Sequence, residues 1–413
     1  MERKVAVTGL GIISCIGNDV KTFWGNLLDG VCGIDRITEF PVDGLSVKIG
    51  GKVKNFDPEA YGIEKSFIRK QDPFTVYAMA AAIQAMQNSG LESGVNIDRF
   101  RLGCNVSSGI GGFETIFREV GKMFETPSGE WISPTFVPSM IANMAAAQIA
   151  IRFKASGPCM NISTACATST HSIGEAYRTI LHGYADAMIT GGTDHCTIPI
   201  GLASFANCRA LTREENPKHA SLPFNADRGG FVLADGAAVL VLEEYGHARL
   251  RGARIYGEIC GYGSTCDAYH ATSPEPEASA QVKAIGLACE QAGYDPAEDC
   301  VYVNAHGTGT RLNDVIETLA FKKAFGAEAD RLHISSTKSM HGHMMGATGA
   351  AEAIATILTV GSGEIPPTIN LDRPDPECDL NYTPNTKQKA GITLGLSNSL
   401  AFGGHNACLA FRK

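Results

Sequence analysis

Residues 159–174 read CMNISTACATSTHSIG, and they lead into a segment whose apolar residues recur at the spacing of an α-helix. The recurring residues are Ile173, Ala176, Tyr177, Ile180 and Leu181. This pattern predicts a strand that passes into a helix, with Cys166 at the junction. There the helix dipole and free backbone N–H groups favour a thiolate. By position alone, the simpler interpretation is a buried structural thiol, one of thirteen cysteines in the chain.

Short apolar runs of strand type recur elsewhere and end in glycine-rich turns. They occupy residues 5–7, 187–190, 301–303 and 333–335. Several precede helical patterns, and the alanine-rich segment 75–86 is predicted to be a helix that stops at Gly90. This alternation predicts an α/β fold.

The two halves of the chain have a similar rhythm, because each opens on a strand with nearby glycines, at residues 5–11 and 255–263. A duplicated unit is plausible, although residue-level similarity between the halves is weak. The polar segment 243–252 is predicted to cross between them. Residues 365–376, which contain four prolines, are predicted to form an extended surface loop.

Composition narrows the function classes. The chain has 413 residues, 44% of them hydrophobic, and a net charge of -8 from 35 Lys and Arg against 43 Asp and Glu, without long charged runs. Nucleic acid is therefore not expected as a partner. No secretory signal and no apolar run of membrane-spanning length is recognisable, so a cytoplasmic protein without a membrane partner is expected. The cysteines form no CxxC pairs, which argues against a disulfide framework or a zinc cluster.

Three C-terminal stretches combine reactive side chains with glycines. Residues 303–314 read VNAHGTGTRLND, residues 335–352 read SSTKSMHGHMMGATGAAE, and residues 396–406 read LSNSLAFGGHN. Surface histidines and an ordinary turn are the plain interpretations. A metal site is not expected, because HxH alone is a weak ligand pattern. Backbone N–H groups of the third stretch are instead suited to hold an oxyanion.

Together with the TACAT motif around Cys166, these stretches resemble the β-ketoacyl-acyl-carrier-protein synthases over nearly the whole chain, specifically the elongating type II enzymes of fatty acid synthesis. The resemblance implies a thiolase-like fold with five α-β-α-β-α layers. It implies two similar halves, each with a five-stranded sheet: residues 1–250 carrying the cysteine, and residues 251–413 carrying two histidines. A homodimer without a cofactor or metal, acting on acyl and malonyl carrier protein, is also implied.

The resemblance assigns roles to individual residues. Cys166 is expected to be the nucleophile, His306 and His343 the two imidazoles that stabilise the malonyl-derived enolate, and Lys338 with Glu352 a supporting pair. His341 stands where the family usually has Thr, so it is expected to be a neighbour and not a catalyst.

Binding roles follow in the same way. Thr308 and Thr310 are expected to bind the pantetheine arm, Ile110 to line the acyl pocket, and Phe402 to gate that pocket and share the oxyanion hole with Cys166. The cations expected to meet the acidic carrier protein are Lys65, Arg69, Lys70 and Arg209, for which simple solvation is an equally good explanation.

Three positions depart from the family pattern. Ala401 stands where a glycine precedes the gating phenylalanine, and it would be strained if that position needed a positive φ. Ala234 replaces another glycine, and Arg311 stands where the family often has proline.

Other interpretations remain. A polyketide ketosynthase subunit is the nearest alternative, and a coenzyme A thiolase is disfavoured by the HGTGT and TKSMHGH motifs. A chain-length-factor-like partner without activity is opposed by the presence of Cys166. A nicotinamide site at residues 8–14 lacks the third glycine and the acidic residue of that motif.

Overall fold

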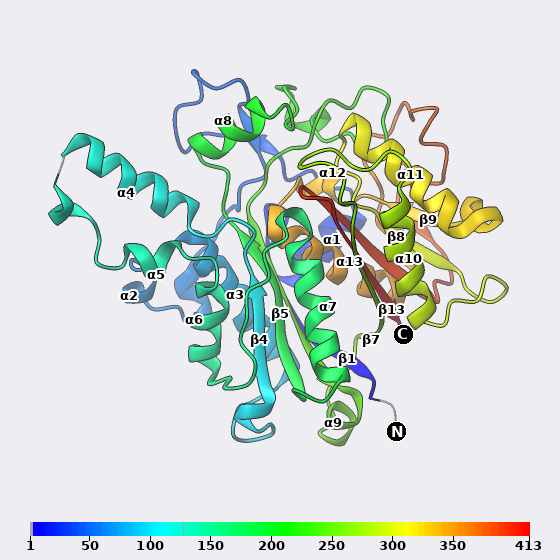
Figure 1. Cartoon of the computed structure of the whole chain (residues 1–413), viewed down its shortest axis with the longest axis horizontal. Coiled ribbons are helices and arrows are strands. Elements are labelled where there is room, and N and C mark those ends of the chain that lie inside the picture. Colours follow the sequence, from blue (N-terminus) through cyan, green and yellow to red (C-terminus); the bar gives the residue numbers. More distant parts are fainter. Residues whose placement is uncertain (1–2, 127) are drawn as a thin grey trace.

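The computed structural model describes residues 3–126 and 128–413. Its largest sheet has nine strands in the order β4-β5-β6-β1-β7-β13-β12-β8-β9 (Figure 1). These strands are β1 (Val5–Ile13), β4 (Leu102–Ser107), β5 (Ala187–Asp194), β6 (Gly236–Glu244), β7 (Gly257–Cys266), β8 (Val301–Asn304), β9 (His333–Ser335), β12 (Leu394–Ala401) and β13 (His405–Arg412).

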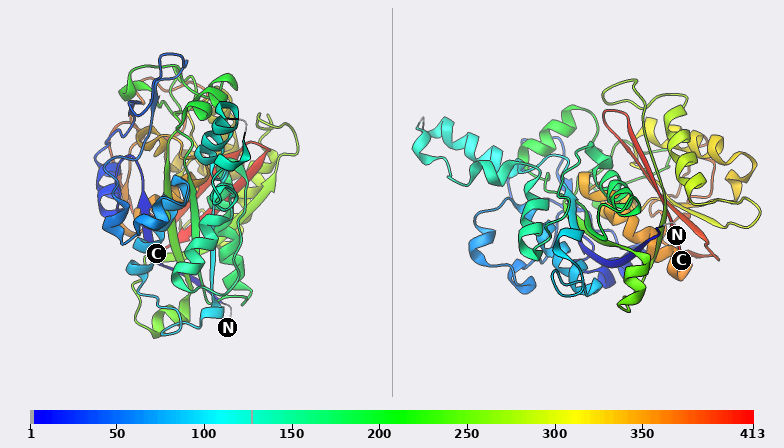
Figure 2. Two further views of the ribbon diagram at one scale, coloured as in Figure 1. Left: turned by 90° about the vertical axis from the view of Figure 1, so that its left-hand side faces the viewer. Right: turned by 60° about the horizontal axis from the view of Figure 1, so that its bottom comes forward.

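Helices cover both outer faces of the sheet and fill the space between its two parts (Figures 1 and 2). The outer helices are α3 (Pro73–Ser89) and α6 (Met144–Phe153) on the first part, and α10 (Ser279–Gln291) and α11 (Arg311–Phe325) on the second. The helices α7 (Thr168–Leu181) and α13 (Thr348–Ser362) contact strands of both parts and lie between them. This arrangement gives the predicted order of five layers.

Shorter elements surround these layers. They are α1 (Val20–Leu28), α2 (Lys65–Ile68), α4 (Phe113–Glu125), α5 (Phe136–Met140), α8 (Pro199–Asn207), α9 (Tyr245–Leu250), α12 (Lys338–His341), β2 (Asp35–Arg36), β3 (Ile49–Gly50), β10 (Glu364–Ile365) and β11 (Gln388–Lys389). Figure 1 shows α4 projecting from the body of the molecule. Among the described residues, no helix has the length and apolar character required to cross a membrane.

Strand β6 shows how one strand supplies two cores. Leu240 and Leu242 belong to the core formed with α7 and α13, whereas Val239 and Val241 belong to the core formed with α3. Because successive side chains of a strand point to opposite faces, a continuous apolar run serves both layers at once.

The glycines of β1 allow α3 to pack directly on the strand. A Cβ added at Gly9 would lie 2.2 Å from the carbonyl oxygen of Ala85, and one added at Gly11 would lie 2.0 Å from that of Ala81. Both distances are far below van der Waals contact, so any side chain at these positions would push the helix away.

The second part repeats this packing on β7 and α10. A Cβ at Gly261 would lie 2.2 Å from the carbonyl oxygen of Ala288, and one at Gly263 would lie 1.8 Å from that of Ala284. In both parts, a pair of glycines two residues apart faces a pair of alanines four residues apart. The similar rhythm seen in the sequence is therefore a structural repeat.

One expectation about the sheet is wrong. Each half was expected to have a five-stranded sheet, but the first part contributes four strands, and the pairing of Val5–Val7 of β1 with Gly257–Ile259 of β7 joins them to the five strands of the second part. The residues of β1 that pair with β7 also pair with β6 along the opposite edge of the strand. Hydrogen bonding therefore continues across the whole sheet. The proposed division after residue 250 falls just beyond α9 and remains a prediction.

The predicted strands all fall within β1, β5, β8 and β9, and the predicted helix 75–86 lies inside α3, which ends at Gly90 with a φ of 65°. The polar segment 243–252 does connect the two parts, but it contains the end of β6 and α9. Glu243 within it is fully buried. Its carboxylate tolerates this position because it accepts hydrogen bonds from Thr8, His247 and Arg251.

The predicted surface loop at residues 365–376 is wrong in its first part. Residues 365–368 are buried, and Thr368 exchanges backbone hydrogen bonds with Thr383 and Asn385. The Thr368 hydroxyl also accepts a hydrogen bond from the backbone N–H of Ser336. Pro366 and Pro367 therefore belong to an extended buried segment, whereas Pro374 and Pro376 are exposed as predicted.

Candidate active site

Predicted catalytic and binding residues from both parts of the chain line one cavity of about 360 Å³. They are Cys166, Arg209, His306, Thr308, Thr310, His343 and Phe402. Lys338 and Glu352 lie buried behind this lining, and Ile110 packs in the same apolar cluster as Cys166 and Phe402.

Cys166 lies in a single 3-10 turn, η4 (Ala165–Ala167), directly before α7. The preceding residues run beside β4, where the backbones of Cys159 and Cys104 form an isolated parallel β-bridge. The predicted strand is therefore an extended segment with only this one bridge. Ala165 has a φ of 49°, a left-handed conformation that costs an L residue about 1–2 kcal/mol. Such strained residues are often found at functional sites.

The prediction that Cys166 favours the thiolate is wrong. Burial raises the pKa of its thiol to about 12, although the charge of Lys338 and the N–H groups of Phe402 and Cys166 lower it. The stabilising groups expected from the sequence are present, but removal from water outweighs them. The resting cysteine is therefore a neutral thiol with two backbone N–H groups close to its sulfur.

His306 follows β8, and its backbone is held by a buried carboxylate. Glu317 on α11 accepts the N–H groups of His306 and Gly307, at 2.7 and 2.8 Å, and also the Asn398 amide at 2.7 Å. Burial raises the pKa of Glu317 to about 7. Sequence reasoning missed both Glu317 and Asn398, because each lies outside the motif it supports.

His343 has a defined tautomer. Its Nδ1 accepts the backbone N–H of Met345 at 3.2 Å and contacts the Thr348 hydroxyl at 2.9 Å. The neutral ring therefore carries its proton on Nε2. Among the described residues this Nε2 is buried and has no hydrogen-bond partner, so it is an available donor at the cavity wall.

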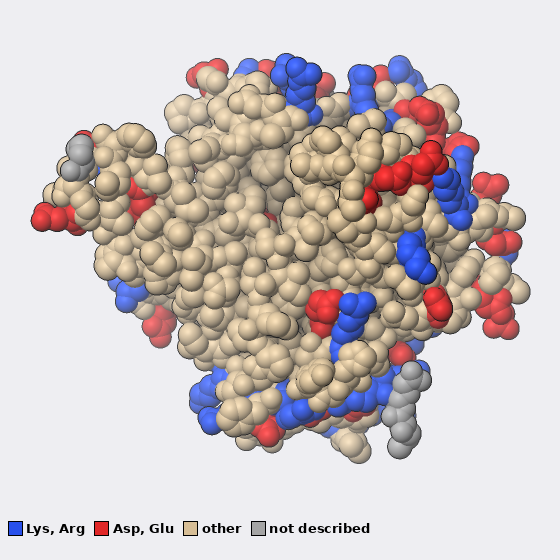
Figure 3. Space-filling model, in the orientation of Figure 1, with Lys and Arg blue, Asp and Glu red and all other residues tan. Residues whose placement is uncertain are grey.

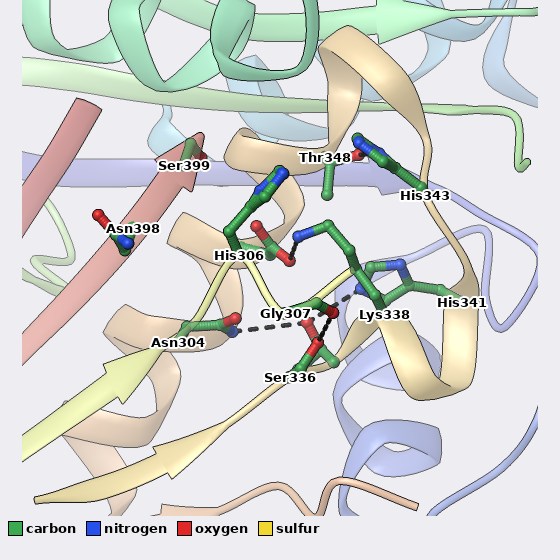
Figure 4. A network of polar contacts seen from close by, with 12 residues as sticks. Asn304, His306, Gly307, Ser336, Lys338, His341, His343, Thr348, Asn398 and Ser399 are labelled. Carbon is green, nitrogen blue, oxygen red and sulfur yellow. Dashed lines mark hydrogen bonds and ion pairs between the residues drawn. The ribbon is translucent and has the colours of Figure 1, made fainter. Parts of the chain in front are cut away.

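The two imidazoles face each other at a right angle, with ring centroids 5.5 Å apart and an interplanar angle of 85°. Burial, and next the charge of Lys338, lowers the pKa of both His306 and His343 well below the usual histidine range. Both rings are therefore neutral at physiological pH. Figure 4 shows the Lys338 side chain extending toward the space between them.

Lys338 and Glu352 form a buried ion pair, with 2.6 Å between Nζ and Oε1. Burial raises the pKa of Glu352 to about 7, against the opposing charge of Lys338. The structure thus pairs these two residues as expected. His341 is hydrogen-bonded to Gly342 and Thr337 and is absent from the cavity lining.

The gate loop differs from the expectation about strain. Ala401 is not among the residues with positive φ, whereas Gly403 and Gly404 have φ values of 86° and 74°. The loop turns at these two glycines, so Ala401 ends β12 without the conformation that would penalise a side chain.

Asp194 is a second buried carboxylate that sequence reasoning missed. It accepts hydrogen bonds from Ser108, Gly109, Ile110 and Gly346 and so ties the loop bearing Ile110 to the turn before α13. Burial raises its pKa to about 6. An acidic residue at the end of a strand is the only sequence signal that pointed to it.

The expected carrier-binding cations fall into two places. Lys65, Arg69 and Lys70 lie on or just after α2, with Lys65 3.4 Å from Glu59, whereas Arg209 lines the cavity. Within the described residues, neither Arg209 nor Arg311, which also lines the cavity, has an ion-pair partner. Among the residues that the structure describes, no group of three side chains is placed to hold a metal ion.

Comparison with known proteins defines the class. The chain matches the model of the beta-ketoacyl synthase N-terminal domain over residues 2–248 and of the C-terminal domain over residues 256–372. It is 46% identical to 3-oxoacyl-[acyl-carrier-protein] synthase 2 of Staphylococcus aureus, covering 100% of this chain and 99% of that protein. It is 43% identical to the Synechocystis protein of the same name, covering 100% and 98%.

Two solved structures at 32% identity superpose with a TM-score of 0.92 over 100% of this chain and 99% of theirs. One is a type II polyketide ketosynthase in complex with its acyl-carrier protein, and the other a beta-ketoacyl synthase from Burkholderia phymatum. The fold and site define a thiolase-like condensing acyltransferase. Within that class, the chain belongs to the beta-ketoacyl synthase family.

Proposed function

We propose that this enzyme is a 3-oxoacyl-[acyl-carrier-protein] synthase that takes an acyl group from its carrier onto Cys166 and elongates it with malonyl carrier. The curated relatives in Staphylococcus aureus and Synechocystis carry that name. The observation that carries the proposal is the free Nε2–H of His343, which lines one cavity with His306 and Cys166.

Acyl transfer proceeds without a net change of charge. The sulfur of Cys166 attacks the thioester carbonyl, the bond to the carrier sulfur breaks, and the thiol proton leaves with that sulfur. The N–H groups of Cys166 and Phe402 hold the transient oxyanion, to which each such donor typically contributes about 3–4 kcal/mol. A buried site favours this route because a free thiolate is costly there.

Decarboxylation uses the two neutral imidazoles. The carbon–carbon bond to the malonyl carboxylate breaks and CO₂ leaves. The electron pair of the broken bond stays with the thioester and forms an enolate. His343 and His306 donate hydrogen bonds to the enolate oxygen through Nε2–H. Because they are already neutral, they stabilise the new charge without first losing a proton. Burial and, after it, the charge of Lys338 keep both imidazoles neutral, and Glu352 balances the charge of Lys338.

Condensation completes the cycle. The enolate carbon attacks the acyl group on Cys166, the oxyanion again lies against the N–H groups of Cys166 and Phe402, and the carbon–sulfur bond breaks. Cys166 then takes up one proton, which balances the carboxylate lost as CO₂. The products are the β-ketoacyl carrier, CO₂ and the free thiol.

The remaining predicted residues bind the substrates. Thr308 and Thr310, whose hydroxyls lie 3.0 Å apart, hydrogen-bond the pantetheine arm. Ile110 lines the acyl side, and Phe402 closes it. Arg209 at the cavity, with Lys65 of α2 and Arg69 and Lys70 just after it, attracts the acidic carrier protein despite the negative net charge of the chain.

The functional unit is a homodimer. Much of the face shown in Figure 3 is free of charged side chains. Exposed apolar residues of the arm around α4 and α5 are Phe117, Val120, Met123, Phe124, Trp131 and Val137. Beside β4, the extended segment around Met160 presents an open sheet edge. A second copy of the chain covers such a surface by pairing its own edge.

The reaction is tested with purified enzyme, malonyl carrier protein and acyl carrier proteins of graded length. The expected product is the β-ketoacyl carrier two carbons longer, seen by mass spectrometry, with the acyl group trapped on Cys166. Acyl groups found on another cysteine, or equal use of coenzyme A thioesters in a non-decarboxylative reaction, would contradict the proposal. Repeated extension without reduction of the keto group would favour the polyketide alternative, to which the ketosynthase neighbours point.

We infer the location from the state of the cysteines. All thirteen are unpaired, so we place the enzyme in a reducing compartment, the cytoplasm.

A further inference from the structure

Gln281 is a buried amide without a partner in the wall of the active-site cavity. It is the third residue of α10, it is 1% exposed, and it lines the cavity that holds Cys166 and His306. Neither its Nε2 nor its Oε1 has a hydrogen-bond partner in the described part of the chain.

An unsatisfied buried amide is unfavourable. Leaving such a donor and acceptor unpaired costs about 1–3 kcal/mol, and nearly all buried polar atoms in native proteins are paired. The neighbouring polar groups do not help, because Asn406 donates to Asp267 at 2.7 Å and Thr265 donates to Ala280 at 2.6 Å. Among the described buried side chains that line the cavity, Gln281 is the one with both a donor and an acceptor unpaired.

Cys166 borders two chemically different environments, an apolar cluster and the lining of the cavity. Ile110 and Met345 form an apolar cluster with Cys166 and Phe402 but lie outside the lining of this cavity. The polar residues Gln281, Asp267 and Thr272 line the cavity itself and form its polar wall. An apolar acyl chain gains nothing beside a free amide, so the polar wall faces the other part of the substrate, the arm that links thioester to carrier.

We propose that Gln281 is a specificity-determining residue that hydrogen-bonds a secondary amide of the carrier's pantetheine arm. A secondary amide offers one donor and one acceptor. These are the two hydrogen-bond partners that the side chain of Gln281 lacks. This inference rests on the proposed use of carrier-bound thioesters and extends it to a residue outside the HGTGT motif.

The test compares two thioesters of the same acyl group, one on pantetheine and one on an alkyl thiol of equal length without amides. The ratio of their kcat/KM values for acylation of Cys166 measures recognition of the amides. Gln281→Met, which keeps the side-chain length, is expected to lower this ratio by about fivefold for each hydrogen bond lost, at about 1 kcal/mol per bond. Gln281→Leu is a second apolar variant in case the first does not fold.

Gln291→Met is the matched control on the same helix. Its amide is already used, because Oε1 accepts the N–H of Tyr262 at 3.1 Å. This control is expected to lower the denaturation midpoint and leave the ratio unchanged, whereas Gln281→Met raises the midpoint by removing an unpaired group.

An unchanged ratio in Gln281→Met and Gln281→Leu, as expected if an ordered water alone pairs the amide, would overturn the role of Gln281. A wild-type enzyme that accepts an acyl group from neither thioester nor from carrier protein would instead overturn the proposed function. The two failures are therefore distinguishable.

Discussion

The turn that carries Cys166 and the turn that follows His343 have the same construction but different contents. Each is a three-residue 3-10 turn, η4 (Ala165–Ala167) or η7 (Met345–Ala347), and each leads into a central helix that starts at a threonine. Each opens with a left-handed residue, Ala165 with a φ of 49° and Met345 with a φ of 50°. At the middle position, the first turn has a cysteine and the second has Gly346.

The difference has a steric cause. A Cβ at Gly346 would lie 2.6 Å from Oδ2 of Asp194 and 2.8 Å from the backbone nitrogen of Gly109, so this position has no space for a side chain. The second turn instead uses Met345 and Thr348 to orient His343. The same backbone turn thus carries Cys166, the proposed nucleophile, in the first half and positions the imidazole of His343 in the second.

Removing the thiol tests the first turn and has the largest expected effect. Cys166→Ala is expected to abolish the acyl-enzyme, because no other group at the turn can attack the thioester. Mass spectrometry of intact protein after incubation with acyl carrier measures this directly. Cys208→Ala, at an exposed cysteine, is the control and should still be acylated; an acylated Cys166→Ala protein would refute the assignment.

The shared packing of the two halves is tested at Gly263. Gly263→Ala is expected to lower the free energy of unfolding by about 3 kcal/mol, because the added Cβ meets the backbone of α10 at 1.8 Å. Gly286→Ala, on α10 itself and with nothing within 4 Å, should raise it by up to about 1 kcal/mol. Denaturant unfolding measures both, and equal effects would show that close packing is not what requires glycine on β7.

The neutral state of the two imidazoles predicts that the rate of CO₂ release hardly changes as the pH is lowered. Because the pKa values of His306 and His343 lie well below 6.5, lowering the pH from 8 to 6 leaves both rings neutral. The rate of CO₂ release should therefore change by less than about twofold, although an ordinary histidine would be about three quarters protonated at pH 6. A steep fall with a midpoint near pH 6.5 would contradict the assigned neutral state.

The smallest effect concerns the left-handed residue before the nucleophile. Ala165→Gly is expected to raise the free energy of unfolding by about 0.5–1 kcal/mol, because glycine adopts a positive φ without a steric penalty. Met345→Gly should instead lower it, since the buried Met345 side chain loses its packing. Thermal or denaturant unfolding of both variants distinguishes strain from packing; a destabilised Ala165→Gly would exclude strain at that turn.

The sequence was sufficient to predict the layers, because strand alternation and glycine stops are local signals, and its short motifs named candidate site residues whose roles remain predictions. The predicted positions of Cys166, His306 and His343 converge on one cavity. Glu317 was missed because it lies outside the motif that it supports, and Asp194 because its partners lie far away along the chain. The thiolate prediction failed at Cys166 because burial, which sets its pKa, depends on tertiary packing that the motif does not encode.

The division of labour between the halves is tested most directly by measuring acylation and CO₂ release in parallel for Cys166→Gln and His343→Ala. We predict a crossed result: Cys166→Gln releases CO₂ from malonyl carrier but takes up no acyl group. His343→Ala, by contrast, is acylated but releases CO₂ about 10²–10³ times more slowly than the wild type. Loss of both steps in both variants, or of acylation in His343→Ala alone, would contradict the account.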